Sequence, residues 1–87
     1  MSIISRDEIV QVILHTVKDE IEVEYEIGLS DPLVDLGLSS MAMVVLVVRF
    51  EEHFDITYED DELLFENFAT VQKIAECIMA KLSSHQV

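Results

Sequence analysis

Two adjacent serines are the residues best placed to do chemistry in this chain. Ser39 and Ser40 follow the turn former Gly37 and open an apolar stretch with helical spacing. If Ser39 caps that helix, the Ser40 hydroxyl lies in the first turn, where unpaired N–H groups and the helix dipole stabilise an anion. A phosphate ester on Ser40 would then need no basic side chain nearby. On this local pattern, the simpler interpretation that both serines only cap the helix stays open.

Three other sets of residues have suitable chemical types but an unsuitable arrangement. Ser40, His53 and Asp55 have the residue types of a hydrolase triad, yet a whole helix separates Ser40 from the other two. The acidic run 59–62 lacks the alternating ligands of a calcium loop. Cys77 has no histidine or cluster of cations near it in the sequence, so we expect a partly buried, unreactive thiol. We therefore expect no catalytic residue, no metal site and no enzymatic activity.

Capping residues and helical spacing predict the elements that must hold Ser40. Ser5 and Glu8 have the spacing of a capping box, and the amphipathic pattern after them predicts a helix to about residue 20. A second, strongly apolar helix is expected from Ser40 to about Phe54, and a last helix after Thr70. These three longer helices account for most of the chain.

Two connections link these helices. Turn-forming residues interrupt 22–39, which predicts a long loop that its own apolar residues hold against the core. The carboxylates at 59–62 precede three apolar residues and favour the start of a short helix. The expected fold class is therefore all-α, with three longer helices and one short helix. We expect a single domain over 1–87, with frayed ends at about 1–4 and 84–87.

The second helix contains more apolar residues than one buried stripe needs. Five of them have the spacing of a core stripe: Met43, Leu46, Val47, Phe50 and Phe54. The surplus predicts an apolar docking surface on the neighbouring face, made of Met41, Ala42, Val45 and Val48. Glu51 and Glu52 would then steer the encounter with a partner rather than hold the complex. The alternative is that the long loop encloses this face and that Val45 belongs to the core.

Charge and composition exclude several classes of protein. The 87 residues include 18 Asp and Glu against 5 Lys and Arg, a formal charge of −13. Such a chain is poorly suited to nucleic acids or anionic membranes, whose binding needs cationic side chains. Its 51% hydrophobic content nevertheless predicts a folded core. The apolar runs are too short to span a bilayer, and the single cysteine allows no internal disulfide, so we expect a cytoplasmic protein. We also expect it to be a monomer.

The order of motifs resembles that of the acyl carrier and peptidyl carrier protein family. The resemblance rests on 36–41 (LGLSSM), on 47–56, and on Thr70-Val71 at the start of the last helix. It covers nearly the whole chain and implies a four-helix bundle with a long loop between the first and second helices. It also implies that Ser40 carries a covalent 4′-phosphopantetheine arm derived from coenzyme A, with capping as a second role.

The chain departs from the family pattern at the start of the second helix. Ser39 stands where fatty-acid carriers commonly have Asp and peptidyl carriers have His or Asp, and Met41 replaces the usual Leu. Ala42 and Val45 stand where fatty-acid carriers place acids, whereas 64–71 is more similar to peptidyl carriers. The resemblance therefore implies a stand-alone acyl or aminoacyl carrier of a specialised polyketide or nonribosomal peptide pathway. A weaker similarity points to carriers of unusual malonyl-type extender units.

A carrier of this kind would meet several enzymes in turn. The resemblance implies a phosphopantetheinyl transferase, a loading adenylation enzyme or acyltransferase, and downstream tailoring and condensing or ketosynthase enzymes. One alternative is a housekeeping fatty-acid carrier. Another, from a different class, is a small acidic domain that mimics nucleic acid or binds a basic partner, which the charge of −13 alone would support.

Overall fold

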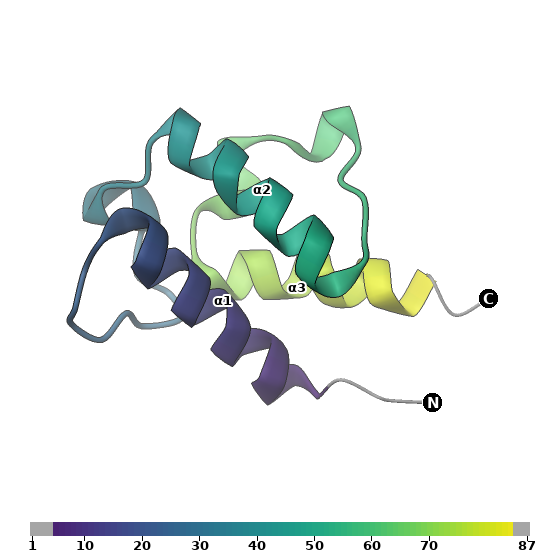
Figure 1. The fold of residues 1–87 in the computed structure, drawn as a ribbon, viewed down its shortest axis with the longest axis horizontal. Coiled ribbons are helices and arrows are strands. Elements are labelled where there is room, and N and C mark those ends of the chain that lie inside the picture. Colours follow the sequence, from purple (N-terminus) through teal and green to yellow (C-terminus); the bar gives the residue numbers. More distant parts are fainter. Residues whose placement is uncertain (1–4, 85–87) are drawn as a thin grey trace.

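Three α-helices make up most of the computed structural model, which describes residues 5–84 (Figure 1). The helices are α1 (Arg6–Ile21), α2 (Ser40–Phe54) and α3 (Val71–Ser84). No residue in this range is in a β-strand, and the predicted all-α class is confirmed. The frayed ends expected at about 1–4 and 84–87 lie outside the described residues, apart from Ser84, which is the last residue of α3.

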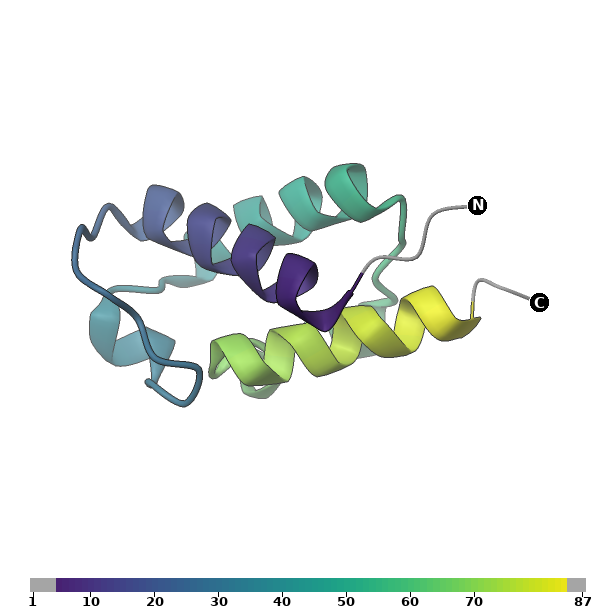
Figure 2. The same ribbon diagram turned by 90° about the horizontal axis from the view of Figure 1, so that it is seen from below.

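The helices pack around α1, which contacts both α2 and α3. α1 and α2 lie side by side and run in opposite directions, whereas α3 crosses α1 at an angle (Figures 1 and 2). α1 begins and α3 ends at one end of the molecule, and α2 begins at the other (Figure 1). Among the described helices, none is both long and apolar enough to cross a membrane.

Each helix begins next to the capping residue that the sequence predicts. The N–H of Glu8 donates to Ser5 Oγ at 3.2 Å and the N–H of Ser5 donates to Glu8 Oε1 at 3.0 Å, so the predicted capping box is confirmed. Ser39 Oγ accepts a hydrogen bond from the N–H of Ala42 at 3.1 Å. Thr70 Oγ1 caps α3 in the same way at 3.1 Å. Such caps typically contribute about 1 kcal/mol each and define where each helix starts.

One cluster of apolar side chains from all three helices forms the core. The buried residues of α2 are those of the predicted core stripe: Met43, Leu46, Val47, Phe50 and Phe54. Ile13 and Val17 of α1 meet them, together with Ile74 and Ile78 of α3. The helical spacing of apolar residues therefore predicted the buried face of α2 correctly.

The connection between α1 and α2 is attached to the core by a few side chains. Ile27, Leu33 and Leu38 are buried, and one 3₁₀ helix, η1 (Leu33–Leu36), interrupts the irregular backbone. The N–H of Leu33 donates to the carbonyl of Ala69 at 2.9 Å, which ties this connection to the residues before α3. Other apolar residues of the connection are exposed: Tyr25, Leu29 and Val34.

The expected fourth short helix is not confirmed. The connection between α2 and α3 contains two 3₁₀ helices instead, η2 (Asp60–Glu62) and η3 (Phe65–Phe68). An isolated short helix is marginal unless it buries an apolar face, since forming its first turn is costly. The three apolar residues directly after the acidic run are exposed, so they supply no such face: Leu63, Leu64 and Phe65.

In the described part of the chain, two basic side chains form ion pairs between different elements of the fold. Arg49 Nη1 of α2 lies 2.9 Å from Asp19 Oδ2 and 3.3 Å from Glu20 Oε1 of α1. Lys81 of α3 pairs with Glu62 of η2. With 18 carboxylates in the chain, these pairs leave a large excess of negative charge.

Added salt is expected to raise the melting temperature. Carboxylates crowd two stretches, 19–26 and 55–62, and their mutual repulsion opposes the compact state. Screening cuts the range of this repulsion from about 30 Å at 0.01 M salt to about 8 Å at 0.15 M. A gain of about 1 kcal/mol would raise the melting temperature by roughly 4–8 °C, measurable by thermal denaturation followed by circular dichroism. A flat or falling melting temperature would show that the pairs of Arg49 and Lys81 outweigh the repulsion.

Tyr58 carries a buried hydroxyl whose removal is expected to stabilise the fold. Its side chain is 6% exposed, its ring centroid lies 5.6 Å from that of Phe68, and Oη has no hydrogen-bond partner in the described part of the chain. Burial raises the pKa of Tyr58 far above its ordinary value. An unsatisfied buried polar group costs about 1–3 kcal/mol. Tyr58→Phe should therefore increase the free energy of unfolding in urea by about 1 kcal/mol. Tyr58→Leu, which also loses the ring packing, should decrease it, and a loss for Tyr58→Phe would mean that Oη is hydrogen-bonded in solution.

Candidate functional site

The first turn of α2 presents an exposed hydroxyl that is not needed for capping. Ser39 has an extended backbone (φ −103°, ψ 171°), its Oγ accepts from the N–H of Ala42, and its carbonyl accepts from the N–H of Met43 at 2.9 Å. Ser40 is the first helical residue and is exposed. The two adjacent serines therefore differ in role: Ser39 holds the helix start, and Ser40 is accessible for chemistry.

A glycine turn delivers the two serines to this position. Gly37 ends η1 with φ +113°, a backbone conformation that residues with a side chain rarely adopt. A Cβ at Gly37 would meet no atom within 4 Å, so the requirement for glycine is conformational rather than steric. Leu38 follows with its side chain buried, and its N–H donates to the carbonyl of Leu33 at 3.0 Å. The turn is thus anchored on both sides, which fixes where α2 begins.

The start of α2 suits a covalently attached phosphate. The N–H groups of Ser40 and Met41 have no carbonyl partner in a preceding turn, and they form part of the positive end of the helix dipole. Residues 36–50 contain no Asp or Glu, the longest such stretch in the chain. An anion on Ser40 would therefore meet less repulsion here than near the acidic runs of this protein.

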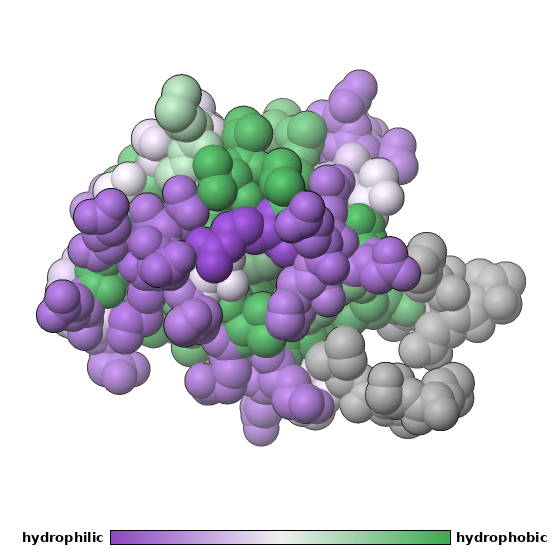
Figure 3. All heavy atoms as spheres, in the orientation of Figure 1, coloured by the Kyte–Doolittle hydropathy of each residue, from purple (hydrophilic) through white to green (hydrophobic). Residues whose placement is uncertain are grey.

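An apolar face of α2 lies beside Ser40. Met41, Val44 and Val48 are 78%, 56% and 47% exposed and share one side of the helix at i, i+3 and i+7. Figure 3 shows the hydrophobic surface over α2 and the neighbouring segment of the α2–α3 connection. Ala42 and Val45 are half-buried at the edge of this face. The sequence-based surface omitted Val44, although its spacing from Met41 and Val48 could have identified it.

The two glutamates predicted to steer a partner have different surroundings. Glu52 is exposed, whereas Glu51 is half-buried and its Oε2 accepts a hydrogen bond from the N–H of Tyr58 at 2.9 Å. Glu51 therefore helps to hold the α2–α3 connection against the end of α2. Sequence reasoning missed this contact because its two partners lie in different elements.

The other residues considered for chemistry do not come together. Ser40 and His53 are thirteen positions apart on α2, about 20 Å along the helix. Asp55 ends α2 in the left-handed conformation at φ 56°. Within the described chain, no group of three or more His, Cys, Asp or Glu could hold a metal ion. Cys77 is half-buried, and its burial raises the pKa of the thiol, as expected for an unreactive cysteine.

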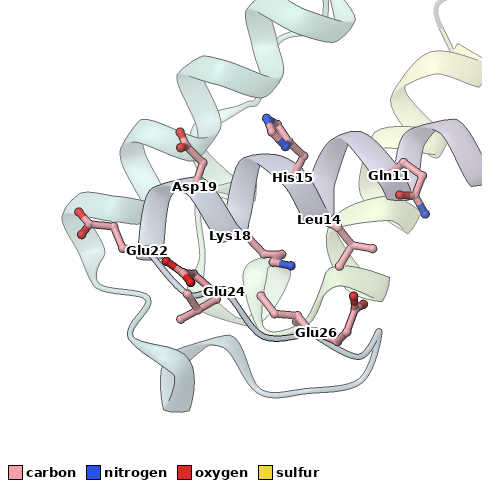
Figure 4. Close-up of a pocket in the computed structure, with 10 residues that line it drawn as sticks. Gln11, Leu14, His15, Lys18, Asp19, Glu22, Glu24 and Glu26 are labelled. Carbon is pink, nitrogen blue, oxygen red and sulfur yellow. The ribbon is translucent and has the colours of Figure 1, made fainter.

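Two surface grooves lie away from Ser40. The larger, about 660 Å³, lies between α1 and the segment after it (Figure 4). Its carboxylates include those of Asp19, Glu22 and Glu24, which point in different directions rather than toward one another (Figure 4). A smaller groove of about 340 Å³ lies between α1 and α2 beside Arg49 and His53. Neither groove includes a residue of the first turn of α2.

Comparison with known protein families gives a match over most of the chain. The model of a family described as "Phosphopantetheine attachment site" matches residues 11–78. The matched range contains Ser39, Ser40 and the whole of α2.

Two proteins of Bradyrhizobium diazoefficiens are similar in sequence. Aminoacyl carrier protein 2 is 42% identical over 52 residues, which cover 60% of this chain and 58% of that protein. Aminoacyl carrier protein 1 is 42% identical over 50 residues, which cover 58% of this chain and 56% of that protein. The matched part of the chain thus spans somewhat more than half the length of these relatives.

A solved structure shares the helical fold. It is the crystal structure of Bradyrhizobium japonicum glycine:[carrier protein] ligase complexed with glycylated carrier protein. A chain of that structure matches with a TM-score of 0.64 and 30% sequence identity. The match covers 84% of this chain and 96% of that chain.

Proposed function

Because the chain belongs to the acyl and peptidyl carrier protein family, whose members bear covalently bound 4′-phosphopantetheine, we propose that Ser40 is the attachment residue. The observation that carries this proposal is the exposed Ser40 hydroxyl in the first turn of α2, directly after a neighbour that already caps the helix. The arm supplies a thiol that holds a cargo as a thioester. We take the whole chain, 1–87, to be one carrier domain.

The residues of the chain hold and orient the attachment point. Gly37 sets the turn, Ser39 fixes the start of the helix, and the N–H groups of Ser40 and Met41 offer hydrogen bonds to phosphate oxygens. Family members are not themselves catalytic, so the enzymes that load and unload the arm supply the chemistry. The chain contributes a fixed and recognisable base for the arm.

We propose an aminoacyl group as the cargo. The similarity to two aminoacyl carrier proteins and to a chain crystallised with a glycine:[carrier protein] ligase supports this proposal. The proposed setting is a specialised nonribosomal peptide or polyketide pathway that uses a stand-alone carrier. A malonyl-type extender unit is the second candidate, for which the support is the Ser40-Met41 pair together with the acidic run 59–62.

We propose that partner enzymes dock on the exposed apolar face of α2, which we call the α2 docking surface: Met41, Ala42, Val44, Val45 and Val48. Burying one valine side chain contributes about 1.5–2 kcal/mol, whereas an exposed ion pair contributes less than about 1 kcal/mol. Apolar contact would therefore hold the complex. Glu52, exposed one turn beyond Val48, would act mainly on the rate of encounter.

The proposed partners are a phosphopantetheinyl transferase, an adenylating enzyme or acyltransferase that loads the arm, and tailoring and condensing or ketosynthase enzymes that use the cargo. The absence of acids from 36–50 argues against a housekeeping fatty-acid carrier, because partners that recognise carboxylates in the first three turns of α2 would find none there. Family membership likewise favours a carrier over an acidic mimic of nucleic acid.

Mass spectrometry tests this function in two steps. The unmodified protein, incubated with coenzyme A and a broad-specificity phosphopantetheinyl transferase, should gain the mass of one arm. The modified protein is then incubated with ATP, amino acids and a glycine:[carrier protein] ligase, or with an acyltransferase and malonyl-type thioesters. Loading of an amino acid, reversed by hydroxylamine, is expected. Loading by malonyl-type units alone would reassign the cargo, and failure to gain the arm would overturn the attachment proposal.

A further inference from the structure

The connection between α2 and α3 is unusually acidic and is joined to α3 by one lysine. Residues 55–70 contain six carboxylates and no Lys or Arg. Lys81 Nζ donates to the carbonyl of Thr57 at 2.7 Å and to the Glu62 carboxylate, and it lies 5.1 Å from the centroid of the Tyr58 ring. The Lys81 side chain is only 14% exposed. A single ammonium group therefore holds both ends of the stretch 57–62.

Opposing forces act on this stretch when it is closed. Tyr58 is buried and its N–H is bonded to Glu51, and the carbonyl of Glu62 accepts from Asn67 Nδ2 at 2.8 Å. Repulsion among the neighbouring carboxylates favours opening. The hydrogen bond from Lys81 is the main cause that holds the pKa of Glu62 below its usual value, so the pair favours the closed form. Loss of Lys81 would leave the carboxylate beside three other acids with no cation to offset them.

The position of this stretch affects the surface that partners would meet. Three exposed apolar residues follow Glu62 directly: Leu63, Leu64 and Phe65. η3, which starts at Phe65, contacts α2. Figure 1 shows the α2–α3 connection passing close to α2. Movement of 57–62 would therefore displace these apolar side chains relative to the α2 docking surface.

We propose that residues 57–66 form a strap that opens as a unit, that Lys81 is its latch, and that the strap regulates the α2 docking surface. This inference rests on the docking function proposed above. With the latch closed, the strap holds Leu63, Leu64 and Phe65 beside α2, where they extend the apolar contact area. With the latch open, the strap leaves α3 while the three helices stay packed, as in a local opening of one segment.

Cys77 provides a probe for this opening. It is the single cysteine, it lies one helical turn before Lys81 on α3, and it is half-buried close enough to Glu62 and Lys81 for both charges to affect its pKa. In a Ser40→Ala background no arm thiol can form, so a maleimide reports Cys77 alone. The charge of Lys81 lowers the pKa of this thiol, so its loss by itself would slow labelling. Faster labelling would therefore report opening.

Lys81→Met removes the charge but keeps an unbranched apolar side chain, and we expect it to speed the labelling of Cys77 by about tenfold. Glu62→Gln removes the other partner of the pair and should also speed labelling, but loss of the Glu62 charge lowers the pKa of Cys77 as well, so opening in this variant is read from hydrogen exchange. Lys73→Met, at an exposed position of the same helix, is the matched control and should leave the rate unchanged. Hydrogen exchange should quicken at Tyr58, whose N–H is bonded to Glu51 of α2, but not in α1.

Each outcome decides between opening and a simpler cause. Unchanged labelling of Cys77 in both latch variants would overturn the strap proposal. An equal rise of hydrogen exchange in α1 and in the strap would also overturn it, because it would indicate global unfolding. If Lys81→Met does not fold, hydrogen exchange at Tyr58 in Glu62→Gln decides, because loss of the Glu62 charge lowers the pKa of Cys77 and would speed labelling without opening. For regulation, Lys81→Met with Ser40 intact should slow arm attachment about threefold or more, and an unchanged rate despite faster labelling would overturn that part. The labelling result does not depend on docking, so failure of the docking proposal would be seen separately, in variants of α2.

Discussion

Ser40→Ala should abolish attachment of the 4′-phosphopantetheine arm, because the variant lacks the hydroxyl that the transferase would use. The protein should show no mass gain after incubation with coenzyme A and the transferase, at any enzyme concentration. Ser40 is exposed in the first helical turn, so the substitution should change the free energy of unfolding by less than about 0.5 kcal/mol. A folded protein that cannot be modified is the expected result.

Ser39→Ala is the matched control for this prediction. It removes the side-chain cap of α2 and should lower the stability by about 1 kcal/mol, which corresponds to a fall of roughly 4–8 °C in melting temperature. The mass gain should persist, since Ser40 still has its hydroxyl. The opposite pair of results, in which Ser39→Ala blocks modification and Ser40→Ala does not, would show that the attachment site has been placed one residue too late.

Val44→Glu should lower kcat/KM for loading of the arm by at least about tenfold while the protein remains folded. Val44 is 56% exposed between Met41 and Val48, so a glutamate there can reach solvent in the unbound protein. In a complex the same carboxylate would be buried against an apolar partner, which costs more than the roughly 1.5–2 kcal/mol of the lost valine contact. Steady-state kinetics of loading test the fall in kcat/KM, and a thermal melt of the same variant tests whether it remains folded.

Two control variants carry the same new charge at a buried and at an exposed position. Val47→Glu places the same charge in the core, where Val47 is 7% exposed, and should unfold or strongly destabilise the domain. Ala80→Glu adds the same charge at an exposed position of α3 and should leave both loading and stability nearly unchanged. Val45 is half-buried, so Val45→Glu would mix the two effects and is the weaker test. Normal loading of Val44→Glu would exclude the apolar face of α2 as the docking surface.

Features that depend on neighbours within one helical turn could be predicted from the sequence. The capping box of Ser5 and Glu8, the cap at Ser39 and the cap at Thr70 each join residues at most three positions apart. The core stripe of α2 follows from the same short spacing, because side chains at i, i+3, i+4 and i+7 lie on one face. The accessible Ser40 is a direct consequence of the cap that precedes it.

Features that join distant elements appeared only in the tertiary structure. Glu51 bonds to Tyr58 around the end of α2, and Lys81 pairs with Glu62 across 19 positions, so no local pattern indicates either contact. The stretch after the acidic run failed to form the expected helix because its apolar residues found no face to bury, which depends on what packs against them. Likewise, helical spacing puts Val44 on one face with Met41 and Val48, whereas the exposure of that face depends on how far the α2–α3 connection covers α2. Local hydrogen bonds and helical periodicity depend on residues a few positions apart, so the sequence shows them directly. Contacts between residues of different elements depend on how the whole chain packs.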